Sequence, residues 1–191
     1  ILHCAGLESG FLIGGLPQDF PFSARLGRSP YFVIEADEYD TAFFDKRSKF
    51  VHYRPRTAVL NNLEYDHADI FPDLAAIETQ FHHLVRIVPR SGRLVVNGRD
   101  EALARVLTRG AWSEQVFFDR PGGWHARDIH ETAQATRFEV WDGATRHGTC
   151  ELTMSGAHSR SNALAAVAAA AHAGVAPEAA LAALGRFQGV R

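Results

Sequence analysis

Two apolar runs that end abruptly at polar residues constrain the fold of this chain more than any other feature. Residues 31–34 (Tyr-Phe-Val-Ile) lead directly into Glu35, and residues 58–60 (Ala-Val-Leu) lead into a polar segment that ends at His67. Short continuous apolar runs are typical of strands buried on both faces, as in parallel sheets. Because ligands bind at the carboxyl ends of such strands, we expect one sheet to bring both polar ends to one crevice.

The first half of the chain alternates between the two kinds of secondary structure. Residues 11–13 and 93–96 are short, apolar and predicted to be strands. Apolar residues recur at spacings of three and four over residues 74–88, which predicts an amphipathic helix, and residues 101–107 predict a shorter one. This alternation favours an α/β fold with a mostly parallel central sheet flanked by helices.

The second half has a different pattern. Between residues 112 and 154, apolar and polar residues alternate on either side of Asp142-Gly143, which predicts an antiparallel hairpin. Beyond it, an alanine-rich stretch predicts a helix capped by Ser159 or Ser161, and Pro177 is placed to open another helix. We therefore add a smaller antiparallel β section to the predicted α/β fold.

Length and composition narrow the class of protein. The 191 residues are 46% hydrophobic, which is enough to bury the core of one domain. A formal net charge of −2 gives no basic field for nucleic acid or an anionic membrane surface, so neither partner is expected. Cys4 and Cys150 lie far apart without zinc-ligand spacing, and no leader or membrane-spanning pattern is present, so a cytoplasmic protein is expected.

Acidic residues crowd the segment after the first apolar run. Glu35, Asp37, Glu38 and Asp40 fall within six positions, and like charges this close favour binding of a cation. Carboxylate and imidazole ligands suit Mg²⁺ or Mn²⁺, which makes Glu35 and His67 candidate metal ligands. A solvated acidic loop is the alternative interpretation.

A second candidate site lies at the start of the alanine-rich helix. His158, Arg160 and Asn162 stand there together. Such side chains at a helix N-terminus can hold an anion or read the edge of a purine. An ordinary capping sequence is the alternative.

These motifs, in this order and spacing, resemble the central domain of the Mur ligases, which form amide bonds in peptidoglycan synthesis. The resemblance rests on residues 35–38 (Glu-Ala-Asp-Glu), 62–67 (Asn-Leu-Glu-Tyr-Asp-His), 158–166 and 187–191 (Phe-Gln-Gly-Val-Arg). Residues 43–53 and 80–85 are similar to one branch of that family, the murein peptide ligases.

The resemblance implies a reaction and roles for individual residues. It implies an ATP- and Mg²⁺- (or Mn²⁺-) dependent ligase of peptidoglycan recycling, which joins UDP-N-acetylmuramate to the tripeptide L-alanyl-γ-D-glutamyl-meso-diaminopimelate. Glu35 and His67 match the family's metal-binding and catalytic residues. The residues that match its nucleotide-binding positions, or lie beside them, are His158, Arg160, Asn162 and Arg191.

One family motif is missing. The phosphate-binding loop of the form G-x-x-G-K-T-T does not occur in the chain. We therefore expect residues 1–191 to be a fragment of the central domain, without the N- and C-terminal domains and inactive by itself. Two other functions stay open: a metal-dependent phosphoester hydrolase that uses Glu35 and His67, and a non-catalytic nucleotide-binding module.

Overall fold

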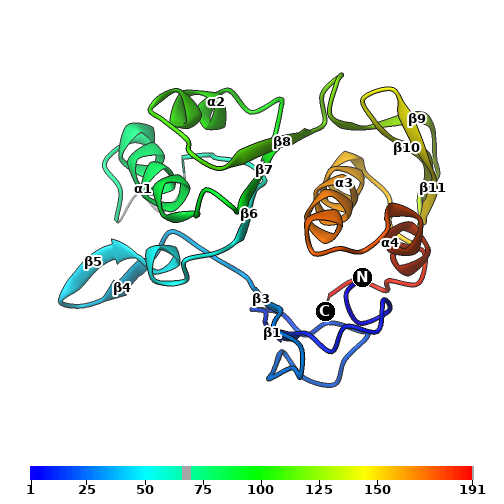
Figure 1. Cartoon of the computed structure of the whole chain (residues 1–191), viewed down its shortest axis with the longest axis horizontal. Helices are drawn as coiled ribbons and strands as arrows, with labels where there is room; N and C mark the ends of the chain where they lie inside the picture. The colour runs from blue at the N-terminus through cyan, green and yellow to red at the C-terminus, as the bar shows by residue number, and fades with distance from the viewer. Residues whose placement is uncertain (66–69, 191) are drawn as a thin grey trace. The chain divides into compact units, whose positions relative to one another are not determined.

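The computed structural model describes residues 1–65 and 70–190, which form two compact units (Figure 1). Unit 1 contains residues 1–35 and 121–190, and unit 2 contains the described part of residues 36–120. None of the described helices is long and apolar enough to cross a membrane.

Unit 2 is built on three parallel strands and two helices. Strand β7 lies between β6 and β8, with Leu60 opposite Val96 and Val96 opposite Phe117. A β4–β5 hairpin and the short 3₁₀ helix η1 precede these strands. The bounds of the elements are β4 (Asp40–Ala42), β5 (Asp45–Ser48), η1 (Lys49–His52), β6 (Thr57–Leu60), α1 (Leu74–Ile87), β7 (Arg93–Asn97), α2 (Glu101–Thr108) and β8 (Glu114–Phe118).

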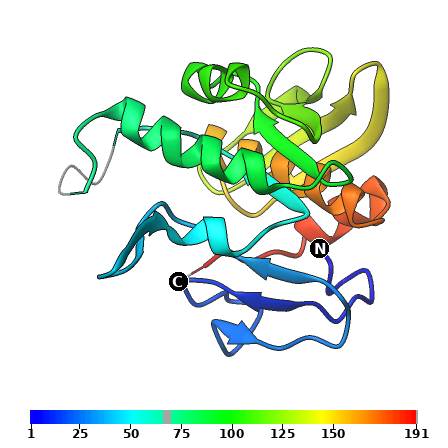
Figure 2. The ribbon, with the colours of Figure 1, turned by 60° about the vertical axis from the view of Figure 1, so that its left-hand side comes forward.

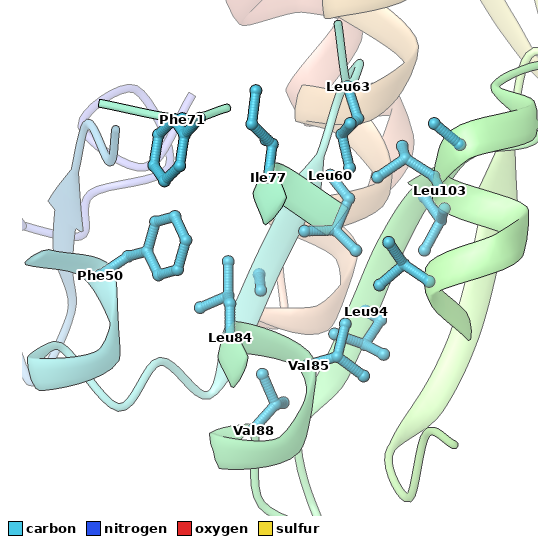
Figure 3. Packing of buried hydrophobic residues seen from close by; sticks show 14 residues of the cluster. Phe50, Leu60, Leu63, Phe71, Ile77, Leu84, Val85, Val88, Leu94 and Leu103 are labelled. Atoms are coloured by element: carbon cyan, nitrogen blue, oxygen red, sulfur yellow. The ribbon is translucent and has the colours of Figure 1, made fainter. Parts of the chain in front are cut away.

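The core of unit 2 explains why α1 is amphipathic. The helix begins after Asp73, whose carboxylate accepts the Ala76 N–H at 2.8 Å, and it ends just before Pro89. Its apolar face packs with side chains from the strands, α2 and η1 (Figure 3). Each such fully buried aliphatic side chain contributes about 1.5–3 kcal/mol. The buried cluster includes Phe50, Leu60, Leu63, Phe71, Ile77, Leu84, Val85, Val88, Leu94 and Leu103.

A buried carboxylate joins the two helices of unit 2. Glu78 of α1 is only 5% exposed, and its two oxygens accept from two arginines of the α2 segment. The Arg105 Nε–Oε1 distance is 2.8 Å and the Arg109 Nη2–Oε2 distance is 2.6 Å. Because both oxygens are paired, the charge is compensated inside the packing between the helices.

Unit 1 contains a small mixed sheet, an antiparallel meander and two helices. In the small sheet, β1 pairs in parallel with β3 and antiparallel with β2 (Figures 1 and 2). In the meander, β10 pairs with both β9 and β11, and α4 packs on β11 while α3 packs against α4 and β9. The bounds are β1 (Gly10–Leu12), β2 (Ala24–Arg25), β3 (Phe32–Ile34), β9 (Trp124–Glu131), β10 (Thr136–Asp142), β11 (Thr145–Leu152), α3 (Ala157–His172) and α4 (Pro177–Leu184).

The predicted fold class is confirmed. Unit 2 provides the parallel strands with their helices, and unit 1 provides the antiparallel section. The predicted hairpin is present, with Asp142 opposite Thr145 and a left-handed φ of +54° at Gly143. Pro177 opens α4 as expected.

The prediction that both polar strand ends belong to one parallel sheet is wrong. Strand β3 lies at the edge of the β2-β1-β3 sheet, whereas β6 belongs to a different sheet together with β7 and β8. The expected double burial of β3 is also absent, because Phe32 is 51% exposed and Val33 is 48% exposed. An apolar run indicates a preference for burial, but it does not specify which strand pairs with it.

Candidate functional site

Glu35 stands immediately after β3, in unit 1, and its carboxylate is fixed by backbone. Its N–H donates to the Leu12 carbonyl at 3.0 Å, which extends the β1–β3 pairing beyond the strand. Its Oε2 accepts the Gly14 N–H at 2.8 Å.

The second oxygen of Glu35 has no hydrogen-bond partner among the described residues. No hydrogen bond reaches Oε1 from the part of the chain that the structure describes, and the side chain belongs to an exposed residue. A carboxylate held at one oxygen and open at the other fits a hard divalent cation such as Mg²⁺. Among residues 1–65 and 70–190 there is no group of three or more His, Cys, Asp or Glu side chains that could hold a metal. The predicted partner His67 lies outside the described residues.

The other acids of the predicted cluster have partners in unit 2. Asp40 pairs with Lys46 at 2.7 Å, and Asp37 lies 3.5 Å from Lys49. These lysines offset the crowding of negative charge that made a bound cation attractive from the sequence. The metal hypothesis therefore depends on Glu35 rather than on the whole acidic segment.

The segment that follows β6 is joined to α2 by Asp100, a residue outside the predicted sites. Asp100 accepts the Leu63 N–H at Oδ2 and the Leu103 N–H at Oδ1, both at 2.8 Å. One carboxylate thus caps α2 and fixes the segment with the Asn-Leu-Glu-Tyr sequence. An aspartate directly before a predicted helix is a recognisable capping signal, but nothing in the sequence indicates its bond to Leu63.

Three of the four predicted nucleotide-binding residues lie in the first turns of α3, in unit 1. His158 and Asn162 are exposed, whereas the Arg160 side chain is only 18% exposed. Arg191 lies outside the described residues. No hydrogen bond or ion pair among the described residues joins Glu35 to any of the three.

The predicted cap of α3 is wrong. The helix begins at Ala157 with Gly156 as its N-cap, so Ser159 already lies inside it. The Ser159 hydroxyl donates backward to the Ser155 carbonyl at 2.9 Å, a bond that serines inside helices commonly make. Glycine at the cap position has φ of +100° and supplies no side-chain acceptor.

Glu131, at the end of β9, supplies an acceptor for the N–H of the N-cap residue itself. Its Oε1 accepts the Gly156 N–H at 3.1 Å, and its Oε2 lies 3.4 Å from Arg160 Nη1. A carboxylate at this end of the helix is favoured by the partial positive charge of the unpaired N–H groups. Arg160 is therefore already engaged by a protein carboxylate.

Comparison with known proteins places these observations in a family. Residues 17–170 match the Mur ligase middle domain. The UDP-N-acetylmuramate–L-alanyl-γ-D-glutamyl-meso-2,6-diaminoheptandioate ligase of Escherichia coli (strain K12) is 52% identical over 191 residues, which is all of this chain and 41% of that protein. The chain thus spans about two fifths of the length of this relative.

Solved structures agree with the fold. The structure of UDP-N-acetylmuramate:L-alanyl-γ-D-glutamyl-meso-diaminopimelate ligase from Neisseria meningitides matches all of this chain and 60% of that chain, with 54% identity and a TM-score of 0.92. A murein peptide ligase from Psychrobacter arcticus matches all of this chain and 43% of that chain, with 42% identity and a TM-score of 0.83.

Proposed function

The chain belongs to the Mur ligase family as its middle domain, and on this premise we propose that it is the ATP-binding part of an amide-forming ligase. The proposed reaction joins UDP-N-acetylmuramate to the tripeptide L-alanyl-γ-D-glutamyl-meso-diaminopimelate. The support is the high identity over the whole chain to ligases named for this reaction. The fragment alone is expected to be inactive, because the chain lacks the phosphate-binding loop.

The proposed chemistry has two steps. The γ-phosphoryl group of ATP is transferred to the muramoyl carboxylate, which releases ADP and leaves an acyl phosphate. The α-amine of the tripeptide then attacks the acyl carbon, the amide bond forms, and inorganic phosphate leaves with the electrons of the broken C–O bond. Mg²⁺ would offset the negative charge on the phosphoryl oxygens.

The residues of this chain have separate parts in this proposal. Glu35 and His67 would hold Mg²⁺, His158 and Asn162 would read the adenine, and Arg191 would approach the nucleotide. The structural observation that carries the proposal is the Glu35 carboxylate, which accepts the Gly14 N–H at Oε2 and has no partner at Oε1 within residues 1–65 and 70–190.

We also place this reaction in the cytoplasm. The two cysteines are free thiols, which suits a reducing compartment.

The test is an activity assay on the full-length protein with matched acid-to-amide substitutions. Formation of UDP-N-acetylmuramoyl-tripeptide is followed by mass spectrometry, and phosphate release is measured as a function of Mg²⁺. Glu35→Gln should lower turnover by roughly 100-fold, because several kcal/mol of charge stabilisation depend on the metal. Asp37→Asn is the control: it removes a nearby acid that pairs with Lys49, and its activity should stay within about threefold of the wild type.

The same assay separates the alternatives. Hydrolysis of simple phosphoesters without either substrate would indicate a metal-dependent hydrolase. Nucleotide binding without turnover would indicate a binding module. An amide product that requires both substrates would contradict both alternatives.

A further inference from the structure

We infer that Glu131 is a positioning residue for the nucleotide-reading end of α3, and that Arg160 acts through Glu131 rather than on the nucleotide phosphates. This inference rests on the proposed function, because it concerns how adenine would be recognised. It differs from the role that the family resemblance implied for Arg160.

Within the described residues, α3 has no side-chain cap from its own N-cap residue. Gly156 has no side-chain acceptor, and no side-chain hydrogen bond caps the helix from its own N-cap residue. Glu131, on a neighbouring strand, instead accepts the N–H of the N-cap residue Gly156 itself at 3.1 Å, which pairs one of the free N–H groups at this helix end. The start of α3 is therefore fixed by β9 rather than by its own sequence.

Arg160 lies one turn into α3, close to the same carboxylate. Its backbone N–H donates to the Gly156 carbonyl at 3.2 Å, and its guanidinium lies 3.4 Å from the other oxygen of Glu131. One carboxylate thus holds both ends of the first helical turn, at Gly156 and at Arg160. His158 lies between these two fixed points, and its side chain is free to face solvent or a ligand.

The platform that carries Glu131 is itself tightly built. The β9–β10 turn is closed by the Thr132 N–H, which donates to the Ala135 carbonyl at 2.9 Å. The Ser155 hydroxyl, just before α3, donates to the Ala133 carbonyl at 3.2 Å. The turn and the helix start are therefore joined at two places, the Glu131 carboxylate and the Ser155 hydroxyl.

The pairing and burial of Arg160 and Glu131 favour a positioning role for Arg160 over a contact with phosphate. The Arg160 side chain as a whole is 18% exposed, while the Glu131 side chain is 41% exposed. The Glu131 carboxylate beside this guanidinium offsets the positive charge that would attract a phosphate. Ion pairs of this exposure contribute little to unfolding stability, so the expected effect is on nucleotide recognition rather than on thermal stability.

The experiment uses the full-length protein and compares ligands with and without phosphates. The KM for ATP, the KM for GTP and the inhibition constant of adenosine are measured for Glu131→Ala, Glu131→Gln, Arg160→Met and the double variant. Glu151→Gln is the matched control, since Glu151 is an exposed glutamate on β11 that lies 3.4 Å from Arg137. Circular dichroism and Tm verify that each variant is folded.

The inference expects a specific pattern. Glu131→Ala and Arg160→Met should weaken ATP and adenosine by the same factor, roughly 5- to 20-fold, with a matching loss of the preference for ATP over GTP. The double variant should be no worse than either single variant, because the two side chains act as one unit. Glu131→Gln retains an acceptor for the Gly156 N–H and should recover part of the affinity, and Glu151→Gln should match the wild type.

Two results would overturn the inference. If Arg160→Met weakens ATP but leaves adenosine unchanged, Arg160 contacts phosphate. If all variants keep wild-type constants and selectivity, Glu131 has no positioning role. Failure of the wild-type protein to use or bind ATP would instead overturn the proposed function, so the two failures are distinguishable.

Discussion

Asp100 offers the sharpest test of how unit 2 positions the segment after β6. Its two oxygens accept different backbone N–H groups, Leu63 at Oδ2 and Leu103 at Oδ1, each at 2.8 Å. Asp100→Asn keeps one acceptor oxygen and replaces the other with an NH₂ group, which cannot accept a hydrogen bond. Whichever way the amide turns, one of the two bonds is lost, whereas Asp100→Ala loses both.

The expected magnitudes follow from these two bonds. Loss of a helix N-cap costs about 1 kcal/mol, and loss of a hydrogen bond to a charged acceptor costs about 1.5–3 kcal/mol. Asp100 is only half-buried, so we take the lower end of both ranges. Asp100→Ala should therefore lower the unfolding free energy by about 2–3 kcal/mol, and Asp100→Asn by about 1–2 kcal/mol.

Asp73→Asn is the matched control for Asp100→Asn. Asp73 caps α1 through a single bond, in which Oδ1 accepts the Ala76 N–H, and asparagine preserves such a cap. Its unfolding free energy should change by less than about 0.5 kcal/mol in urea titrations followed by circular dichroism. In the full-length protein, Asp100→Asn should also lower ligase turnover, whereas Asp73→Asn should not. Equal stability and activity of the two asparagine variants would refute the double role of Asp100.

Two further predictions concern buried groups. Glu78→Gln weakens the ion pairs that join α1 to α2, so it should lower the unfolding free energy by about 1–2 kcal/mol and speed hydrogen exchange in α2. Glu114→Gln alters an exposed ion pair and should lower the unfolding free energy by less than about 1 kcal/mol. Equal exchange rates in the two variants would contradict this prediction. Burial raises the pKa of the Cys150 thiol to about 12, and the neighbouring Glu151 carboxylate adds a smaller effect in the same direction. Little Cys150 thiolate is therefore present at pH 8, and iodoacetamide should modify only the exposed Cys4. Mass spectrometry should find one adduct on the native protein and two in urea, and two adducts on the native protein would be evidence against the burial of Cys150.

The positions of helices and strands could be predicted because they depend on local patterns. The spacing of apolar residues located α1, and the Asp142-Gly143 sequence located the β10–β11 turn. The sheet to which a strand belongs depends on its partner, and that partner is not encoded in the strand's own residues. For this reason the position of β3 along the chain is predictable from its residues, whereas the prediction that it shares a sheet with β6 is wrong.

The candidate site divides in the same way. Glu35, His158 and Asn162 could be selected from the sequence because they belong to short motifs with a family resemblance. The hydrogen-bond partners that position these segments could not be selected from the sequence, because they lie far away along the chain. Glu35 and its donor Gly14 are 21 residues apart, and Glu131 and Gly156 are 25 residues apart. His67 and Arg191 remain predictions from the sequence.

The three bonds that fix the candidate segments have the same chemistry. In each, a carboxylate accepts a backbone N–H from a distant part of the same unit: Glu35 from Gly14, Asp100 from Leu63 and Glu131 from Gly156. A backbone N–H is supplied by every residue except proline, so the donor leaves no trace in the sequence. The acceptor is visible in the sequence, because only an acidic side chain makes the charge-assisted form of this bond. An acidic residue can therefore position a segment by accepting a backbone N–H, without a bound cation or a basic partner. Because the donor cannot be recognised in the sequence, the acidic residues alone do not show which segments they position.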